Sequence, residues 1–303
     1  MLIQHVEGFL THLRVEKSAS VLTITSYKTD LIQFFSFISR QYKVPAEEVS
    51  QELLNHKTVR EYLAFLQENG LSRATTARKL ASLRSFVKYL CREGVLAGNP
   101  IAAVATPKQD KRLPKFLYPR EIELLINAPD ISTPNGTRDK AILETLYAAG
   151  LRVSELVGMD IKDIDFGEQI IKVRGKGNKE RIIPLGSKAR EALINYIETG
   201  RKKLLQKNEN SCPALFLNKY GDRISQRSIR NILNKYVEDI ALSQKISPHT
   251  LRHTFATHLL NGGADLRTVQ ELLGHVKLST TQIYTHLTRD NIKTIHNETH
   301  PRR

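Results

Sequence analysis

Side chains that can bind anions or move protons crowd into the stretch between Ser247 and His286. Histidines recur through it, with an arginine and a tyrosine among them, at His249, Arg252, His253, His258, His275, Tyr284 and His286. Such a set fits three kinds of site: a metal centre, a buried polar core or a centre for phosphate chemistry. The spacing of the residues separates these alternatives.

The metal interpretation fits the spacing poorly. His249 and His253 lie four residues apart, as in a zinc-protease helix, but Thr250 stands where that motif needs a glutamate. No carboxylate or cysteine lies between them to complete a ligand set. We therefore expect no metal and no other cofactor, with His258 and His286, like His253, in structural or surface roles.

The phosphate interpretation fits the local structure expected around His249. Ser247 followed by Pro248 predicts the start of a helix, because serine is a favoured N-cap and proline a favoured first residue. Free N–H groups and the helix dipole favour an anion at such an end. His249 and Arg252 would share one face of the first turn, and the positive end would favour a neutral, proton-accepting His249.

Two further candidates follow in consecutive short elements. A helix is expected to start after Asp265 as its N-cap and to end at Gly274, with His275 as the next residue. A third short helix, beginning at Ser279, would carry Tyr284. Because the connections are short, we expect His275 and Tyr284 to converge.

The charge of the chain indicates a polyanionic partner. The 303 residues carry a formal net charge of +15, which suits nucleic acid or an anionic membrane surface. No apolar run reaches the roughly 18 residues that a membrane span needs. The amphipathic N-terminus carries acids, which favours a helix over a signal peptide. Cys91 and Cys212 lie far apart without a CxxC motif, which predicts buried thiols in a reducing cytoplasm.

The first hundred residues predict an all-helical domain with a basic stripe. Apolar residues recur three or four apart, as in "SRATTARKLASLRSFVKYLCREG", where Leu80, Leu83, Val87 and Leu90 form the buried face. From residue 72 to residue 115, ten Lys or Arg stand against two acids. A solvated helix face is the alternative, but with the overall charge we expect phosphate contacts from Arg73, Arg78, Lys79, Arg84, Lys88, Lys108, Lys111 and Arg112.

Prolines at 100, 107, 114 and 119 predict a semi-rigid connector between two domains. We expect an N-terminal helical DNA-binding domain at 1–105, a basic linker at 106–115 and a second domain at 116–303. Runs at 170–173 and 181–185 flank the turn "RGKGNK", which predicts a hairpin among helices. The expected fold class is mainly α with a small β-sheet.

Five motifs follow one another in a characteristic order: "GLRVSEL" with Arg152, "VRGKGNKERIIPL" with Lys176, "HTLRH" with His249 and Arg252, "LLGH" with His275 and "TQIYTH" with Tyr284. This ordered set, over nearly the whole chain, resembles the tyrosine site-specific recombinases of the phage integrase family, in particular their Xer type. The resemblance implies a two-domain clamp around duplex DNA.

The resemblance also implies the chemistry. Tyr284 would attack a DNA phosphorus, giving a 3′-phosphotyrosyl link and a free 5′-hydroxyl. A phenol of pKa about 10 is mostly protonated at pH 7, a handicap of about 4 kcal/mol, so a base is needed and His249 is the candidate. Arg152 and Arg252 would hold the non-bridging oxygens. Lys176 would protonate the leaving oxygen, and a histidine at 275 would donate to the phosphate, without metal or ATP.

The partners implied are a double-stranded DNA recombination site, a homo- or hetero-tetramer with a second Xer-type recombinase, and a septal DNA translocase, but no membrane. The cellular role would be resolution of chromosome or plasmid dimers at cell division. The tail after Tyr284 has a small apolar face and is too short to be stable alone. We expect it to pack on a neighbouring protomer, with folding back on its own domain as the alternative.

Several interpretations stay open at this level. Glu155, one turn after Arg152, either orients a catalytic basic group or is an ordinary helix acid. A type IB topoisomerase uses much the same chemistry, and a mobile-element integrase or excisionase shares the motifs. A catalytically silent DNA-binding protein could share the fold.

Overall fold

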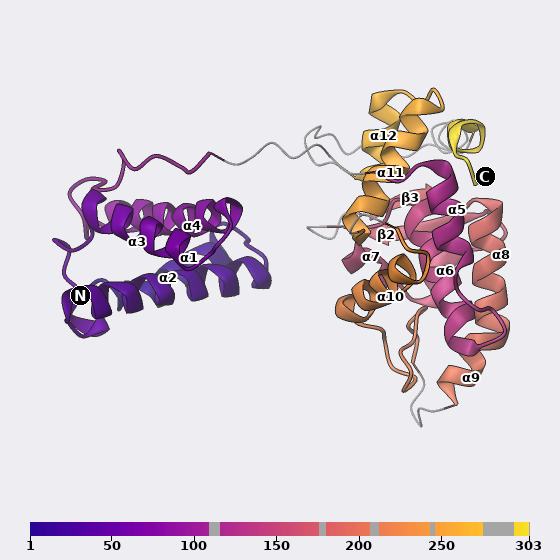
Figure 1. Cartoon of the computed structure of the whole chain (residues 1–303), viewed down its shortest axis with the longest axis horizontal. Helices are drawn as coiled ribbons and strands as arrows, with labels where there is room; N and C mark the ends of the chain where they lie inside the picture. Colours follow the sequence, from indigo (N-terminus) through magenta and orange to yellow (C-terminus); the bar gives the residue numbers. More distant parts are fainter. Residues whose placement is uncertain (109–115, 176–179, 207–211, 243–245, 275–293, 303) are drawn as a thin grey trace. The chain divides into compact units, whose positions relative to one another are not determined.

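The computed structural model describes residues 1–108, 116–175, 180–206, 212–242, 246–274 and 294–302. The chain divides into two compact units, Met1–Arg112 and Leu113–Arg303 (Figure 1). The finer division into two domains and a separate linker at 106–115 stays a prediction, because most of that linker lies outside the described residues. In the part of the chain that is described, no helix is long and apolar enough to cross a membrane.

The N-terminal unit is built from helices packed around aromatic side chains. Its elements are α1 (His5–Val15), α2 (Val21–Tyr42), the short 3₁₀ turn η1 (Ala46–Glu48), α3 (His56–Glu68) and α4 (Arg73–Arg92). Side-chain oxygens of Ser20, Asn55 and Ser72 accept backbone N–H groups at the starts of α2, α3 and α4. Phe9 and Phe86 are fully buried and meet edge to face. The predicted apolar face of α4 is confirmed, since all four of its residues are buried.

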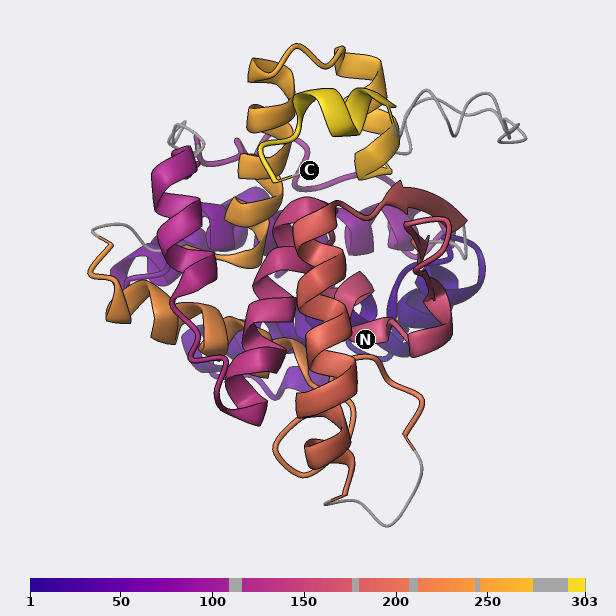
Figure 2. The same ribbon diagram turned by 90° about the vertical axis from the view of Figure 1, so that its right-hand side faces the viewer.

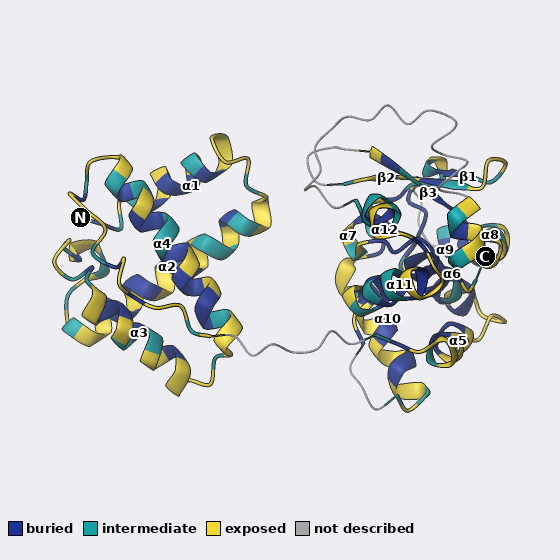
Figure 3. Ribbon diagram, turned by 90° about the horizontal axis from the view of Figure 1, so that it is seen from above, coloured by how far each residue is buried: buried dark blue, intermediate teal, exposed yellow. Residues whose placement is uncertain are grey.

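The C-terminal unit is centred on α6 (Pro134–Ala148), which is buried over nearly its whole length (Figure 3). Around it pack α5 (Pro119–Asn127), α8 (Ser187–Asn195) and α11 (Pro248–Asn261). The chain continues from α8 through the π-helical segment η4 (Tyr196–Arg201) into α9 (Lys202–Leu205). The unit is completed by α7 (Val153–Gly158), the 3₁₀ turn η2 (Ile161–Asp163), α10 (Gln226–Asp239) and α12 (Leu266–Leu273).

A three-stranded antiparallel sheet lies beside these helices, in the order β1 (Ile164–Asp165), β2 (Ile170–Arg174), β3 (Glu180–Pro184). Ile171 pairs with Ile164 on one side and with Ile183 on the other. The predicted hairpin is confirmed, with bounds that differ by one residue, and so is the fold class. The strand β1 was not predicted, because two residues are too few to establish an alternating pattern.

The expected boundaries of α11 and α12 are confirmed, whereas the third helix, expected from Ser279, lies outside the described residues. Ser247 caps α11, with Pro248 as its first residue, and Asp265 caps α12. Gly274 ends α12 in the left-handed conformation, at φ 66°. Cys91 and Cys212 are free thiols, although each is partly rather than fully buried.

The end of the chain folds back on its own unit. Residues 294–299 form a short helix beside the C-terminal end of α11 (Figure 2). His296 Nε2 bonds to Ala148 O at 3.0 Å, and Arg302 pairs with the buried Glu144. In the single chain, residues 294–302 thus take the alternative position, folded back on their own domain, and packing on a neighbouring protomer stays a prediction for the assembly.

Candidate active site

Arg152 lies at the start of α7, where its own backbone and side chain both engage Glu155. The Arg152 N–H donates to Glu155 Oε2 and its Nη1 donates to Glu155 Oε1, each at 2.8 Å. The arginine side chain nevertheless keeps 42% of its surface exposed. The guanidinium is thus held from one side and presented to solvent on the other.

Arg252 is the buried counterpart of Arg152. It lies in the first turns of α11, where its Nη1 donates to Gly150 O at 2.6 Å and its Nη2 to Leu273 O. These bonds connect α11 to the turn before α7 and to the end of α12. Burial, followed by the nearby charge of Arg152, lowers the pKa of Arg252 to about 10. At neutral pH the guanidinium therefore stays charged.

Glu155 is the acid around which the arginines gather. It accepts two hydrogen bonds of 2.8 Å from Arg181, and Arg252 Nη1 lies 3.9 Å from its Oε2. Burial alone would raise the pKa of Glu155, but the hydrogen bonds and charge of Arg181, with the hydrogen bonds of Arg152, lower it to about 2. Of the two interpretations left open by the sequence, the structure supports the orienting one.

His249 lies in the first turn of α11 and is exposed. It precedes Arg252 by three residues, so both belong to the same end of the helix. The other predicted catalytic residues, Lys176, His275 and Tyr284, lie outside the described residues, and their positions stay predictions. Among the residues that are described, no group of three or more His, Cys, Asp or Glu is placed to hold a metal ion.

Arg181 is the site residue that the sequence did not predict. It lies on β3, is 7% exposed, and bonds to Glu155 and to Leu272 O of α12. A usable signal was present in "ERIIPL", where Arg181 and the apolar Ile183 occupy the same face of a strand. A charged residue on the buried face of a strand predicts a buried partner.

Some residues of the predicted basic stripe are exposed, and others form hydrogen bonds within the N-terminal unit. Arg73, Arg78, Lys88 and Lys108 are exposed, whereas Lys111 and Arg112 lie outside the described residues. Arg84 is half-buried and bonds to Val104 O and Thr106 Oγ1, so it fastens residues 104–106 to α4.

Lys79 is a correction to the predicted stripe. Its side chain is 5% exposed, and its ammonium donates to Asp30 Oδ1 at 3.0 Å and to Gln33 Oε1. Asp30 is itself buried and needs a compensating charge, which Lys79 and Arg78 supply. Lys79 is therefore removed from the set of expected phosphate contacts.

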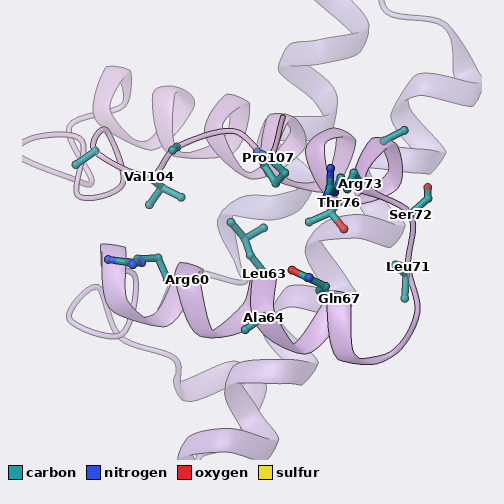
Figure 4. A pocket seen from close by; sticks show the side chains of 13 residues that line it. Arg60, Leu63, Ala64, Gln67, Leu71, Ser72, Arg73, Thr76, Val104 and Pro107 are labelled. Carbon is teal, nitrogen blue, oxygen red and sulfur yellow. The ribbon is translucent and has the colours of Figure 1, made fainter. Parts of the chain in front are cut away.

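A groove of about 1370 Å³ opens on the same unit, between α3, α4 and residues 103–107 (Figure 4). Arg60 and Arg73 are the charged residues of its lining, and Gln67, Ser72 and Thr76 add polar groups. None of the residues that line it is acidic. The groove thus carries the same sign of charge as the exposed residues of α4.

Both units match protein families that are already known. A profile of the phage integrase family matches residues 115–291, and one of the phage integrase N-terminal SAM-like domain matches residues 6–94. The chain belongs to the phage integrase family and is a site-specific tyrosine recombinase, an enzyme that exchanges DNA strands.

Within that family the chain is similar to tyrosine recombinases XerC. It is 51% identical over 300 residues to XerC of Pelotomaculum thermopropionicum, and the matched region spans 98% of each chain. It is 46% identical over 297 residues to XerC of Bacillus subtilis, which covers 98% of this chain and 96% of that one. The predicted resemblance to the Xer type is confirmed.

Solved structures share the fold. The XerH site-specific recombinase, in a post-cleavage complex with a palindromic difH substrate, matches with a TM-score of 0.70 at 23% identity, over 92% of this chain and 80% of that one. A dimer of lambda integrase bound to a core site matches with a TM-score of 0.67 at 17% identity, over 96% and 94%. Both of these neighbours are bound to DNA.

Proposed function

We propose that this recombinase cuts and rejoins double-stranded DNA with six catalytic residues, namely Arg152, Lys176, His249, Arg252, His275 and Tyr284. The observation that carries the proposal is the gathering of Arg152 and Arg252 around Glu155, beside an exposed His249. Guanidinium groups outnumber carboxylates in this cluster, so it is suited to an added anion such as a phosphodiester.

The two arginines are suited to hold the non-bridging oxygens of that phosphate. A guanidinium has five N–H donors, and Arg252 uses two of its nitrogens on the carbonyls of Gly150 and Leu273. The remaining N–H groups stay available while the side chain is fixed. Donors that are fixed before the reaction need no reorganisation as charge develops, and the loss of one typically costs about 100- to 1000-fold in rate.

The proposed reaction moves two protons and exchanges one bond. The phenol of Tyr284 loses its proton to His249 and forms a bond to phosphorus, while the bond to the 5′-oxygen breaks. Lys176 gives a proton to that oxygen, and His275 donates a hydrogen bond to the phosphate. Rejoining reverses these steps with a 5′-hydroxyl from another strand.

Charge and bond energy are both provided within this scheme. The arginines and the lysine supply the positive charge that stabilises the transition state. The phosphotyrosyl link conserves the energy of the broken phosphodiester, so the scheme requires no ATP.

We propose further that the DNA contacts of the N-terminal unit come from Lys88 and Lys108 and from the groove lined by Arg60 and Arg73. Exposed cations on α4 and an acid-free groove favour the polyanionic backbone over other partners. Arg78 and Arg84 would add to this surface through the parts of their side chains that stay exposed.

The proposed substrate is a recombination site of chromosome or plasmid dimers, resolved in the cytoplasm at cell division. Similarity to XerC proteins over nearly the full length favours this role over integration or excision of a mobile element. The assembly would be a tetramer of this chain alone or with a second Xer-type recombinase, and a septal DNA translocase would be a further partner.

Covalent trapping on a library of duplexes tests the proposal. Reactions in excess EDTA are denatured, the protein–DNA adducts are isolated, and the attached DNA is sequenced. We expect adducts that share one short site, linked through a 3′-phosphate. Adducts without a common site, together with relaxation of plasmids that lack one, would identify a type IB topoisomerase instead. Absence of any adduct would leave only DNA binding.

A further inference from the structure

Arg181 joins three segments of the C-terminal unit that are far apart in sequence. From β3 it reaches Glu155 of α7 with two hydrogen bonds of 2.8 Å, and its Nε donates to Leu272 O of α12 at 3.0 Å. The side chain is 7% exposed, and Gly274 lies against it: a Cβ on that glycine would come within 3.1 Å of Arg181 Cδ. Arg181 is therefore a buried side chain that connects three segments and has little contact with solvent.

Arg181 and Arg252 bind consecutive carbonyls at the end of α12. Arg181 Nε donates a hydrogen bond to Leu272 O, and Arg252 Nη2 donates one to Leu273 O. The unpaired carbonyls and the dipole at this end of a helix favour cations. Both guanidiniums also lie near Glu155, but at different distances. Arg181 bonds to this carboxylate directly at 2.8 Å, whereas the nearest nitrogen of Arg252 is 3.9 Å away, beyond hydrogen-bond range.

We propose that Arg181 is a positioning residue that occupies the carboxylate of Glu155 and so keeps Arg252 available to the DNA phosphate. With Arg181 in place, both oxygens of Glu155 receive hydrogen bonds from Arg181 and Arg152. Without it, a buried carboxylate would lose its main partner, and the nearest replacement is Arg252. The inference rests on the proposed role of Arg252 as a phosphate-binding group.

A buried charge that loses a partner is costly, which would drive Arg252 toward Glu155. A buried carboxylate that loses its more buried guanidinium partner keeps only the hydrogen bonds of the half-exposed Arg152, so a nearby cation is drawn in to compensate its charge. Arg252 would need to move by only about 1 Å to come within hydrogen-bond distance of Glu155. A displacement of that size at a reacting group can cost about 100-fold in rate.

The test compares Arg181→Met, Glu155→Gln and the double variant by single-turnover cleavage of a duplex that carries the recombination site. Arg181→Met should lower the cleavage rate about 100-fold, with little change in DNA affinity. Adding Glu155→Gln to Arg181→Met removes the charge that captures Arg252, so the double variant should cleave faster than Arg181→Met alone, by about tenfold. Glu155→Gln alone measures the cost of loosening Arg152, which Glu155 also holds. A double variant that shows no rescue beyond that cost would overturn the proposal, because a merely structural role of Arg181 gives no rescue.

Arg201→Met is the matched control for loss of a buried arginine. Arg201 is also 7% exposed and donates to backbone carbonyls, at Ala214 and Cys212, but not to Glu155. We expect Arg201→Met to lower the melting temperature and to keep the wild-type cleavage rate. If Arg201→Met slowed cleavage as much as Arg181→Met, the effect of Arg181 would be one of general stability.

Arg181→Lys keeps the experiment informative if Arg181→Met does not fold. Lysine keeps a charge beside Glu155 but cannot form the bidentate pair and the bond to Leu272 O together. It should cleave about tenfold more slowly than wild type, and a full rate would overturn the proposal. Cleavage by the wild-type protein in the same assay tests the proposed function separately, since its failure would appear there first.

Discussion

At the scale of single residues, the site brings three positive charges close together and compensates them with one acid. Arg152, Arg181 and Arg252 gather within one small region, and their mutual repulsion opposes folding. Glu155 offsets it by contacting all of them, and its own pKa falls to about 2 as a result. The carboxylate thus stays ionised at neutral pH.

Lys176→Ala separates the proposed general acid from the rest of the site. We expect the variant to cleave ordinary DNA at least 100-fold more slowly, because the 5′-oxygen leaves without a proton. A substrate with sulfur at that position needs little protonation and should restore most of the rate. If sulfur gives no rescue, Lys176 contributes by binding the phosphate instead. Arg152→Ala is the control, since sulfur should not rescue the loss of a phosphate contact.

Gly150→Ala tests the turn that carries a carbonyl partner of Arg252. Gly150 lies at φ 53°, and a Cβ there would come within 2.4 Å of Phe255 Cδ1. Left-handed strain of about 1–2 kcal/mol and overpacking of about 1–3 kcal/mol should both lower the free energy of unfolding. Gly263→Ala provides the control, because that position has φ 98° but open space around it. Equal losses of stability in denaturant titrations would contradict the packing argument.

Sequence patterns predicted the residues whose partners lie nearby in the sequence. They missed residues whose partners lie far away in the sequence. The capping of α11 by Ser247 was predictable because a cap depends on residues within one turn. Lys79 was assigned to the surface and Arg181 was not singled out, because each is paired with an acid distant in sequence, Asp30 or Glu155. A charge pattern along one helix or strand carries no information about such partners.

At the scale of elements, the tail packs against the start of the turn at Gly150 that precedes α7. His296 bonds to Ala148 O, two residues before Gly150, whose carbonyl binds Arg252. The rings of His296 and His300 stack with centroids 4.8 Å apart. The tail therefore packs directly against the segment that leads to Arg152. A small apolar face in the sequence indicated that the tail must pack somewhere, but not on which surface.

Acid should loosen this tail. Burial lowers the pKa of His258, His296 and His300, with Tyr147, Glu144 and Arg302 packed around them. Below about pH 6.5 the unfolded chain binds protons that the folded chain does not, so the free energy of unfolding falls as pH falls. We expect residues 294–302 to lose amide protection between pH 7.5 and pH 5.5.

His300→Gln is the matching variant for that measurement. Removal of one titrating ring should make the melting temperature less dependent on pH, even if the variant is less stable at every pH. Equal protection of the tail at both pH values in the wild-type protein would show that these imidazoles do not control its docking.

At the scale of the whole molecule, the positive charge has two different uses. Part of it is neutralised inside the units by buried acids, as in the Lys79–Asp30 and Arg181–Glu155 pairs. Another part is exposed on α4 and along the acid-free groove beside it. The composition predicted a polyanionic partner correctly, but the division between internal and external charge required the folded structure.

Salt dependence distinguishes these two uses. Lys88 is exposed on α4, so Lys88→Ala should reduce the slope of log affinity against log salt by about 1. Lys79→Met should leave that slope unchanged and lower the stability of the N-terminal unit, because Asp30 loses a buried partner. Titrations of a duplex at several salt concentrations measure both. A reduced slope for Lys79→Met would return this residue to the DNA-contacting set.

The central claim is that Tyr284 is the nucleophile, and one experiment tests it directly. The wild-type protein and Tyr284→Phe are each incubated with a nicked duplex that traps the covalent intermediate, and adducts are resolved on denaturing gels and digested for mass spectrometry. We expect the wild-type adduct to map to a peptide in which Tyr284 carries a 3′-phosphate. Tyr284→Phe should bind the same DNA with unchanged affinity and form no adduct. An adduct in that variant, or a link mapped to another residue, would contradict the claim.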